Sequence, residues 1–248
     1  MRKAYFISDL HLGAGHMADD RLNERRAVAF LDSIKNDACE LYLLGDILDY
    51  WYEYKHVVPR GYVRFFGKLA ELADSGVKIT WLIGNHDIWI FDYIPSELGV
   101  EVIDGTLQRD VLGTRFEMEH GDAIGGNFKF RVMRSLFRNR FCQWLYAGLH
   151  PRLTVGFAKA CSRRSRLKKG VVGEWPRDLF NSIRDHVVEE VEKGNPSKYF
   201  IYGHLHYSRE ESVADGRKLI ILGAWITSYT YGVFDGESFQ IKTFDQNT

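Results

Sequence analysis

The first half of the chain alternates short apolar runs with longer segments in which apolar residues recur every three to four positions. Three runs are almost wholly apolar and predict buried strands at Lys3–Ser8, Leu41–Leu44 and Val77–Ile83. The segments between them, Asp19–Lys35 and Tyr62–Ser75, have the period of amphipathic helices. This alternation predicts three parallel strands joined by right-handed crossovers, as in an α/β fold.

The second half predicts further strands, interrupted by a long helical stretch. We expect short strands at Val100–Asp104, Leu107–Leu112, Arg115–Glu119, Tyr199–Tyr202, Arg209–Val213, Lys218–Gly223, Tyr229–Phe234 and Phe239–Thr243. The pattern predicts helices at Ile94–Leu98 and Glu174–Lys193, and two or more amphipathic helices between Phe128 and Leu167. The dipeptides Asp215-Gly216 and Asp235-Gly236 indicate hairpins.

Residues that commonly bind metals follow five of the predicted strands. They are Asp9-Leu10-His11, Gly45-Asp46-Ile47-Leu48-Asp49, Gly84-Asn85-His86-Asp87, His120 and Gly203-His204-Leu205-His206. One such motif alone is more often a turn, a helix cap or a buried histidine. Five of them, each at a strand terminus, favour a common site, because open α/β sheets bind ligands at the carboxyl ends of their strands.

These residue types suit a pair of divalent ions. Two ions about 3.5–4 Å apart need one shared anionic ligand, and separate ligands for each ion. Mixed Asp, His and Asn ligands favour Mn²⁺, Fe²⁺, Zn²⁺ or Co²⁺ over Ca²⁺ or Mg²⁺, and we expect Mn²⁺. The predicted bridging ligand is Asp46, with Asp9, His11 and His206 at one ion and Asn85, His120 and His204 at the other.

Charge is distributed unevenly along the chain. The totals of 33 basic and 33 acidic residues cancel, so net charge points to no particular partner. However, the stretch Ala123–Gly173 contains no acidic residue and twelve basic ones. This contrast predicts an insert at 125–170 within a core formed by 1–124 and 171–248.

The insert combines positive charge with large apolar side chains. These include Phe128, Phe130, Phe137, Phe141, Trp144, Leu145 and Phe157. That combination suits an anionic membrane surface, or a lipid with a phosphorylated head group. Two alternatives stay open: an ordinary amphipathic helix pair with a solvated basic face, and nucleic-acid binding. Aromatic residues at helical spacing disfavour the second, because they indicate a buried face.

The remaining composition points to the cytoplasm. Three cysteines are few, odd in number and not at metal-binding spacing, which predicts reduced thiols. The apolar run after Arg2-Lys3 is too short for a signal peptide. No apolar run approaches the roughly 20 residues that span a bilayer. We therefore expect a cytosolic protein that is soluble or peripheral to a membrane.

The five motifs, in their order along the chain, resemble the pattern of the calcineurin-like metallophosphoesterases. The resemblance implies a four-layer αββα sandwich, the ligand assignment above, and hydrolysis of phosphate esters or phosphoanhydrides by an activated water. It also implies that His86 contacts the phosphoryl group or protonates the leaving oxygen, and that Asn85 lies near the substrate. Asp49 could orient His86 by accepting its second N–H, or could be a plain turn residue. Asp87 and Asp122 are expected to brace loops.

Within that superfamily the chain resembles the UDP-2,3-diacylglucosamine hydrolases, which carry a helical cap after the motif matched by His120-Gly121-Asp122. This implies cleavage of a lipid-linked nucleotide at its pyrophosphate, giving the lipid monophosphate and UMP. The cap would hold the acyl chains, and Arg163, Ser165, Arg166 and Lys168 could hold phosphates. The chain departs from many members at His86, where they have arginine. Alternatives are another phosphodiesterase, a phosphatase or a nuclease. A non-catalytic scaffold is disfavoured because every ligand is present.

Overall fold

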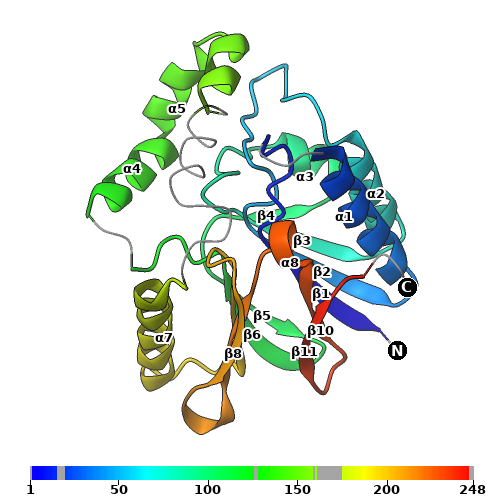
Figure 1. The fold of residues 1–248 in the computed structure, drawn as a ribbon, viewed down its shortest axis with the longest axis vertical. Coiled ribbons are helices and arrows are strands. Elements are labelled where there is room, and N and C mark those ends of the chain that lie inside the picture. The colour runs from blue at the N-terminus through cyan, green and yellow to red at the C-terminus, as the bar shows by residue number, and fades with distance from the viewer. Residues whose placement is uncertain (1, 16–19, 126–127, 159, 161–174, 246–248) are drawn as a thin grey trace.

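Two β-sheets packed face to face, with helices on both outer faces, form the body of the molecule (Figure 1). The structure, a computed structural model, describes residues 2–15, 20–125, 128–158, 160 and 175–245. The first sheet has the order β11-β10-β1-β2-β3-β4. Its strands are β1 (Lys3–Ile7), β2 (Ala38–Leu44), β3 (Lys78–Leu82), β4 (Glu101–Ile103), β10 (Thr230–Phe234) and β11 (Phe239–Thr243).

In this sheet β1, β2, β3 and β4 run parallel to one another, and β10 and β11 form a hairpin that pairs antiparallel with β1. The second sheet has the order β5-β6-β7-β9-β8, with a parallel centre and antiparallel edges. Its strands are β5 (Leu107–Val111), β6 (Thr114–Glu119), β7 (Tyr199–Tyr202), β8 (Ser208–Ser212) and β9 (Lys218–Leu222).

Helices cover the outer face of each sheet. The helices α1 (Asp20–Ile34), α2 (Val63–Asp74) and α3 (Tyr93–Leu98) pack on the first sheet, and α7 (Arg177–Glu192) packs on the second (Figure 1). The spacing of the apolar residues decides which face is buried. In α2 the buried positions are Phe65, Phe66, Leu69 and Leu72, which form a single stripe at helical period.

Aromatic side chains fill the space between the two sheets. Phe6 on β1 stacks against Tyr42 on β2 at 5.0 Å, and against Phe116 of the opposite sheet at 5.6 Å between ring centroids. All three side chains are fully buried. Burial of each such ring contributes about 1.5–3 kcal/mol. This packing holds the two sheets in a fixed relation, and with it the loops at their ends.

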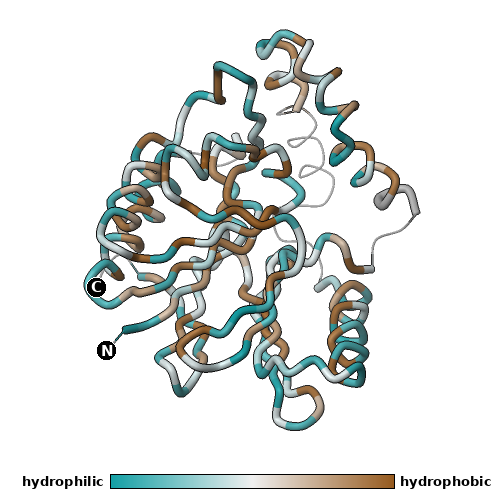
Figure 2. Tube along the Cα trace, turned by 180° about the vertical axis from the view of Figure 1, so that it is seen from behind, coloured by the Kyte–Doolittle hydropathy of each residue, from teal (hydrophilic) through white to brown (hydrophobic). Residues whose placement is uncertain are grey.

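Three helices project beside the sandwich, at the upper left of Figure 1, and we call residues 128–158 the helical arm. They are α4 (Phe128–Arg138), α5 (Arg140–Ala147) and a helix at 151–158. Asn139 separates the first two, because its side chain accepts the backbone N–H groups of Phe141 and Cys142 and so caps α5. Apolar and polar residues alternate along the arm (Figure 2).

The predicted βαβαβ order and the mixed α/β fold with two sheets are confirmed. The helix predicted at Glu174–Lys193 begins at Arg177, because Pro176 occupies the N-cap. The short helices α8 (Trp225–Ser228) and η1 (Ala214–Gly216) were not predicted. Within the described parts of the chain, no helix combines the length and the apolar character that crossing a membrane requires.

Candidate dinuclear metal site

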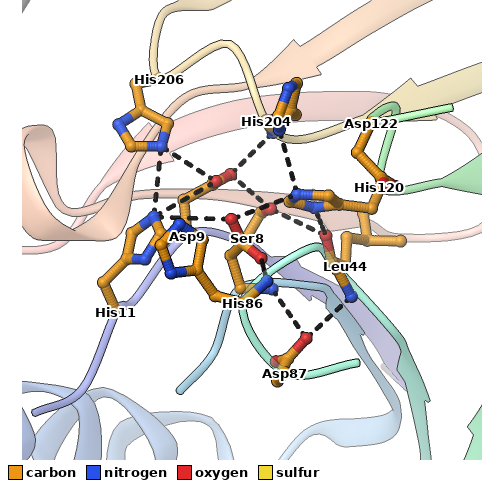
Figure 3. A network of polar contacts seen from close by, with 12 residues as sticks. Ser8, Asp9, His11, Leu44, His86, Asp87, His120, Asp122, His204 and His206 are labelled. Atoms are coloured by element: carbon orange, nitrogen blue, oxygen red, sulfur yellow. Dashed lines mark hydrogen bonds and ion pairs between the residues drawn. The ribbon is translucent and has the colours of Figure 1, made fainter. Parts of the chain in front are cut away.

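Side chains of the five predicted motifs lie close together. Figure 3 shows six of them around one centre: Asp9, His11, His86, His120, His204 and His206. Each lies in the loop that follows a strand, so the parallel strands deliver them to the same edge. The loops after β1, β2 and β3 come from the first sheet, and those after β6 and β7 come from the second. Residues separated by almost the whole chain thereby become neighbours: Nε2 of His11 lies 3.2 Å from Nε2 of His206.

Glycines make this convergence sterically feasible. A Cβ atom on Gly84 would lie 2.3 Å from Oδ1 of Asp46, and one on Gly203 would lie 2.0 Å from Oγ of Ser8. A Cβ atom on Gly45 would lie 2.5 Å from Nδ1 of His120. Glycine is therefore required at these three positions, because any side chain would collide with a neighbouring loop of the site.

The backbone is strained where the candidate ligands lie. Five of them have a positive φ angle, in the left-handed region that non-glycine residues rarely adopt. Such conformations cost energy and persist only where surrounding contacts enforce them, commonly at functional sites. The residues are Asp9 (55°), His11 (44°), Asp46 (53°), His204 (65°) and His206 (61°).

The first group of candidate ligands comprises Asp9, His11 and His206. Nε2 of His206 lies 3.2 Å from Oδ1 of Asp9 and 3.2 Å from Nε2 of His11. Two nitrogens that bind one ion at about 2.0–2.1 Å are roughly 3 Å apart. The separation of the two imidazole nitrogens therefore matches that of ligands to a single cation.

The second group comprises Asp46, His120 and His204. Nε2 of His120 lies 3.3 Å from Oδ2 of Asp46 and 3.3 Å from Nδ1 of His204. At its other nitrogen, His120 donates from Nδ1 to the carbonyl oxygen of Leu44, at 2.8 Å. That hydrogen bond fixes the orientation of the ring and directs Nε2, the atom that would bind an ion after losing its proton, at the group.

Asp46 lies between the two groups. Its Oδ2 is 3.3 Å from His120 and 3.8 Å from His11, while its Oδ1 accepts the backbone N–H of His86 at 2.8 Å. One carboxylate oxygen is thus anchored to the loop, and the other faces both imidazoles. This is the position that a shared anionic ligand needs.

Oδ1 of Asn85 is buried and accepts no hydrogen bond from the described residues, and the buried Oδ1 of Asp9 faces imidazole nitrogens, with Nε2 of His206 at 3.2 Å and Nε2 of His11 at 3.8 Å. By contrast, Oδ2 of Asp9 accepts from Oγ of Ser8 at 2.6 Å and from the backbone N–H of His204 at 3.0 Å. Buried acceptors left without donors are costly unless a cation meets them. The residues present therefore fit divalent metal ions.

The carboxylates are held in the charged state. Burial would raise the pKa of Asp9, but the imidazoles of His206 and His120 outweigh burial and lower that pKa to about 2. Burial likewise opposes ionisation of Asp46, yet the neighbouring His120 keeps its pKa well below the ordinary value. Both groups are anionic at neutral pH, as metal ligands must be.

Two of the histidines are held neutral. Burial lowers the pKa of His11 to about 4, although Asp49 and Asp46 favour its charged form. Burial, and then the charge of His120, lower the pKa of His204 to about 4. Neutral imidazole is the form that binds a metal, so these two side chains are ready to do so at pH 7.

His86 and Asp49 lie at the edge of the site, next to His11. Nδ1 of His86 is 2.9 Å from the backbone carbonyl oxygen of Asp49 and 3.4 Å from its carboxylate. The same carboxylate oxygen is 3.4 Å from Nδ1 of His11. The side chain of Asp49 is 2% exposed and that of His86 is 27% exposed, so His86 is the one that a substrate can reach.

Asp87 braces the loops, as expected. Its carboxylate accepts the backbone N–H groups of Gly84 at 2.8 Å and Ile47 at 2.9 Å, and the indole N–H of Trp81 at 3.2 Å. It thereby joins the loop of Asp46 to the loop of His86. Asp122 braces a different contact, since Nε of Arg134 in the helical arm lies 2.9 Å from its carboxylate.

The structure brings Asp9, His11, Asp46, Asp49, His86, His120, His204 and His206 together, and it places Asn85 on the same loop as His86. The predicted phosphate contacts Arg163, Ser165, Arg166 and Lys168 lie outside the described residues. Ser8 was missed, although a small polar residue directly before Asp9 in an apolar strand was a usable signal. The carbonyl of Leu44 carries no signal in sequence.

Comparison with known proteins agrees with the geometry. The model of the calcineurin-like phosphoesterase family matches residues 2–208. A UDP-2,3-diacylglucosamine hydrolase of Porphyromonas gingivalis (strain ATCC BAA-308 / W83) is 39% identical, over 98% of this chain and 98% of its own. A protein with the same name from Vibrio atlanticus (strain LGP32) is 24% identical, over 97% and 96%. The solved structure of an archaeal phosphodiesterase superposes with a TM-score of 0.50 at 14% identity, covering 98% of this chain and 99% of that one.

The predicted superfamily and fold are confirmed by these matches. The chain is a hydrolase that acts on phosphate bonds, and its clustered His and Asp residues imply divalent metals. The sequence match and the convergence of the five motifs lead to one conclusion: this chain belongs to the calcineurin-like phosphoesterase family.

Proposed function

We propose that this protein cleaves the pyrophosphate of UDP-2,3-diacylglucosamine, releasing the lipid monophosphate and UMP, with two Mn²⁺ ions as cofactors. The observation that carries the proposal is the near full-length similarity, at 39% identity, to a UDP-2,3-diacylglucosamine hydrolase. It covers 98% of both chains, so it includes the insert as well as the metal-binding loops.

The metal ligands would be divided between two ions. Asp9, His11 and His206 would hold one, Asn85, His120 and His204 would hold the other, and Asp46 would bridge them. Bound there, the ions would supply Lewis acidity that activates a water molecule and neutralises charge on the phosphoryl oxygens. Fe²⁺, Zn²⁺ and Co²⁺ are also compatible with this donor set.

His86 would act on the substrate itself. The carbonyl oxygen of Asp49 accepts its Nδ1–H, which turns Nε2 toward the substrate. In the imidazolium form, Nε2–H would contact the phosphoryl group or protonate the leaving oxygen. Asp49 would act through the histidines, because its carboxylate faces Nδ1 of both His86 and His11. Asn85, one residue before His86, would contact both metal and substrate.

The helical arm would bind the lipid part of the substrate. Its apolar side chains include Phe141, Trp144 and Phe157, which are 65%, 68% and 70% exposed. Phe141 and Trp144 stack with their ring centroids 6.0 Å apart, and neighbouring exposed apolar side chains of this kind mark surfaces that meet a partner. A substrate with two acyl chains supplies one. The insert 125–170 would thus form a cap on a core of 1–124 and 171–248, with Arg163, Ser165, Arg166 and Lys168 holding phosphates.

The same surface suits the cytoplasmic face of the inner membrane, where a diacylated substrate resides. Exposed aromatic side chains can enter the boundary between head groups and acyl chains, while basic residues contact anionic lipids. Nucleic acid would offer phosphates to the basic residues but no apolar environment for the exposed aromatic side chains. We therefore place the protein as a peripheral cytoplasmic enzyme that takes its lipid-linked nucleotide from the membrane.

The direct test is to incubate the purified protein with Mn²⁺ and UDP-2,3-diacylglucosamine in detergent micelles and to measure UMP. We expect one UMP for each lipid monophosphate formed, and no UMP from His204→Ala. UDP-N-acetylglucosamine, which lacks the acyl chains, should be a poor substrate. Hydrolysis of small phosphodiesters or DNA, without cleavage of the lipid nucleotide, would refute the substrate and leave the family intact.

A further inference from the structure

Three tyrosines alternate with two core residues in the segment that directly follows Asp49. Tyr50, Tyr52 and Tyr54 occupy every second position, as on one side of an extended chain. Between them, Trp51 is fully buried in the core under the first sheet, and Glu53 is 5% exposed. The segment therefore has two sides, one facing the core and the other bearing tyrosines.

Each tyrosine hydroxyl meets the helical arm. The hydroxyl of Tyr50 lies 3.0 Å from that of Tyr146 in α5, and the hydroxyl of Tyr52 donates to the carbonyl oxygen of Gln143 at 2.7 Å. The hydroxyl of Tyr54 is hydrogen-bonded to Oγ1 of Thr154, in the helix at 151–158.

Trp89 makes the contact with the remaining helix. Its indole N–H donates to the carbonyl oxygen of Phe137, at the end of α4, at 2.9 Å. Its ring packs 5.6 Å from the ring of Phe137 and 4.9 Å from that of Tyr146. Four side chains outside the arm thus contact the three helices of the arm.

The two loops that carry these four side chains are joined by Glu53. Its carboxylate accepts the backbone N–H groups of Phe91 at 2.6 Å and Asp92 at 2.8 Å, and the indole N–H of Trp51 at 2.9 Å. The backbone N–H of Glu53 also donates to the carbonyl oxygen of Trp89 at 3.2 Å. Charge-assisted bonds of this kind are strong and directional. The support for the arm is therefore rigid.

The same two loops carry functional residues. Tyr50 follows Asp49 directly, and Trp89 is three residues after His86. His86 in turn contacts the carbonyl of Asp49. A side chain fixed on either loop has a defined position relative to the candidate metal ligands, so anything docked on these side chains is placed at a set distance from the reacting phosphate.

We propose that Tyr50, Tyr52, Tyr54 and Trp89 form a docking surface that sets the position of the helical arm beside the metal site, and thereby the affinity for substrates that extend onto the arm. The inference rests on the proposed function as far as it concerns the lipid. The four residues are positioning residues: they act through the arm and touch neither the phosphate nor the metal ligands.

The variants that test this remove hydrogen bonds and keep aromatic rings. One carries Tyr50→Phe, Tyr52→Phe and Tyr54→Phe together, and a second carries Trp89→Phe. The matched control is Tyr231→Phe on β10, whose ring packs against Tyr5 and Phe30, away from the arm. On the arm side, Tyr146→Phe removes the partner of Tyr50 without altering a core loop.

The first readout does not depend on any substrate. Hydrogen–deuterium exchange of residues 128–158 should be faster in the triple variant and in Trp89→Phe than in the wild type or Tyr231→Phe. The second readout is kinetic. The KM for UDP-2,3-diacylglucosamine should rise by roughly 10-fold or more in the triple variant, since each neutral hydrogen bond contributes a factor of about 2–13. The rate on bis(4-nitrophenyl) phosphate should stay within about twofold.

A double-mutant cycle sharpens the assignment. If Tyr50 acts through Tyr146, then adding Tyr50→Phe to Tyr146→Phe should change the KM much less than Tyr50→Phe alone. Unchanged exchange in the arm, or equal losses on the lipid nucleotide and the small diester, would overturn the proposal. If the wild-type protein fails to cleave the lipid nucleotide, the proposed function is refuted, and the exchange experiment still decides whether these residues dock the arm.

Discussion

Asp49 holds His86 through its backbone as well as through its side chain. The carbonyl oxygen of Asp49 lies 2.9 Å from Nδ1 of His86, closer than the carboxylate, which is 3.4 Å away. The carboxylate is equally close to Nδ1 of His11, so it serves a candidate metal ligand and a candidate catalytic residue together. The backbone of Asp49 therefore orients His86, while its carboxylate places a negative charge beside both His86 and His11.

The first prediction follows from these two roles. Asp49→Asn keeps the carbonyl that orients His86 but removes the negative charge shared by His86 and His11. We expect turnover to fall by about 10- to 100-fold, the usual cost of losing a carboxylate behind a metal-binding histidine. The measurement is kcat with saturating Mn²⁺, alongside metal content. Asp110→Asn, at an exposed carboxylate on β5, is the control. Wild-type turnover in Asp49→Asn would reduce Asp49 to a turn residue.

The second prediction concerns Gly84. A Cβ atom there would lie 2.3 Å from Oδ1 and 2.4 Å from the backbone nitrogen of Asp46, so Gly84→Ala must displace the loop that bears the proposed bridging carboxylate. We expect a loss of about 1–3 kcal/mol in the free energy of unfolding and at least a tenfold loss of turnover. Thermal unfolding and kcat are the measurements.

Gly67 supplies the matched control for this substitution. It lies in α2, and a Cβ atom there would meet nothing within 4 Å. Gly67→Ala should therefore leave activity unchanged, and should stabilise the helix by up to about 1 kcal/mol because alanine has the higher helix propensity. Equal effects of the two substitutions would contradict the steric argument for Gly84.

The third prediction is that affinity for Mn²⁺ rises with pH. In the metal-free protein, burial alone would lower the pKa of His120, but Asp46 raises it well above the ordinary value of 6.5. Burial would also lower the pKa of His206, but the charge of Asp9 outweighs burial and raises that pKa. A bound cation must displace these protons, which become scarcer as pH rises. Calorimetric titrations at pH 6, 7 and 8 should give falling Kd values, and a pH-independent Kd would count against both histidines as ligands.

The fourth prediction concerns the insert. The candidate metal ligands named above lie in loops after strands of the two sheets, outside the range 128–168. Replacing that range with a flexible linker should spare cleavage of bis(4-nitrophenyl) phosphate and abolish cleavage of UDP-2,3-diacylglucosamine. Parallel assays of both substrates test this. Equal loss of both activities would make the insert part of the core.

Much of this arrangement could be predicted from the sequence, because apolar runs mark the buried strands and polar motifs follow them directly. Asp9, Asp46 and His120 were identifiable on that basis alone, since parallel strands end at a common edge. The boundaries of the helices were less accurate. The short helix α8 was missed, because its four residues, Trp225–Ser228, are too few to show a helical period.

Other features depend on the fold and leave little trace in the chain. The positive φ angle of His11 arises because contacts between loops enforce it, and nothing in the residue type predicts it. Tyr50 and Tyr52 are buried. The role of their hydroxyls emerges only when Gln143 and Tyr146, about 90 residues away, lie against them.

We propose that side chains scattered from Asp9 to His206 hold two divalent ions, with Asp46 between them. Equilibrium dialysis against Mn²⁺, followed by measurement of bound metal per chain, tests it most directly. We predict two ions per wild-type chain, and one or none in Asp46→Ala, with hydrolysis lost in the variant. A wild-type chain that hydrolyses its substrate at full rate after complete removal of divalent metals would contradict the account.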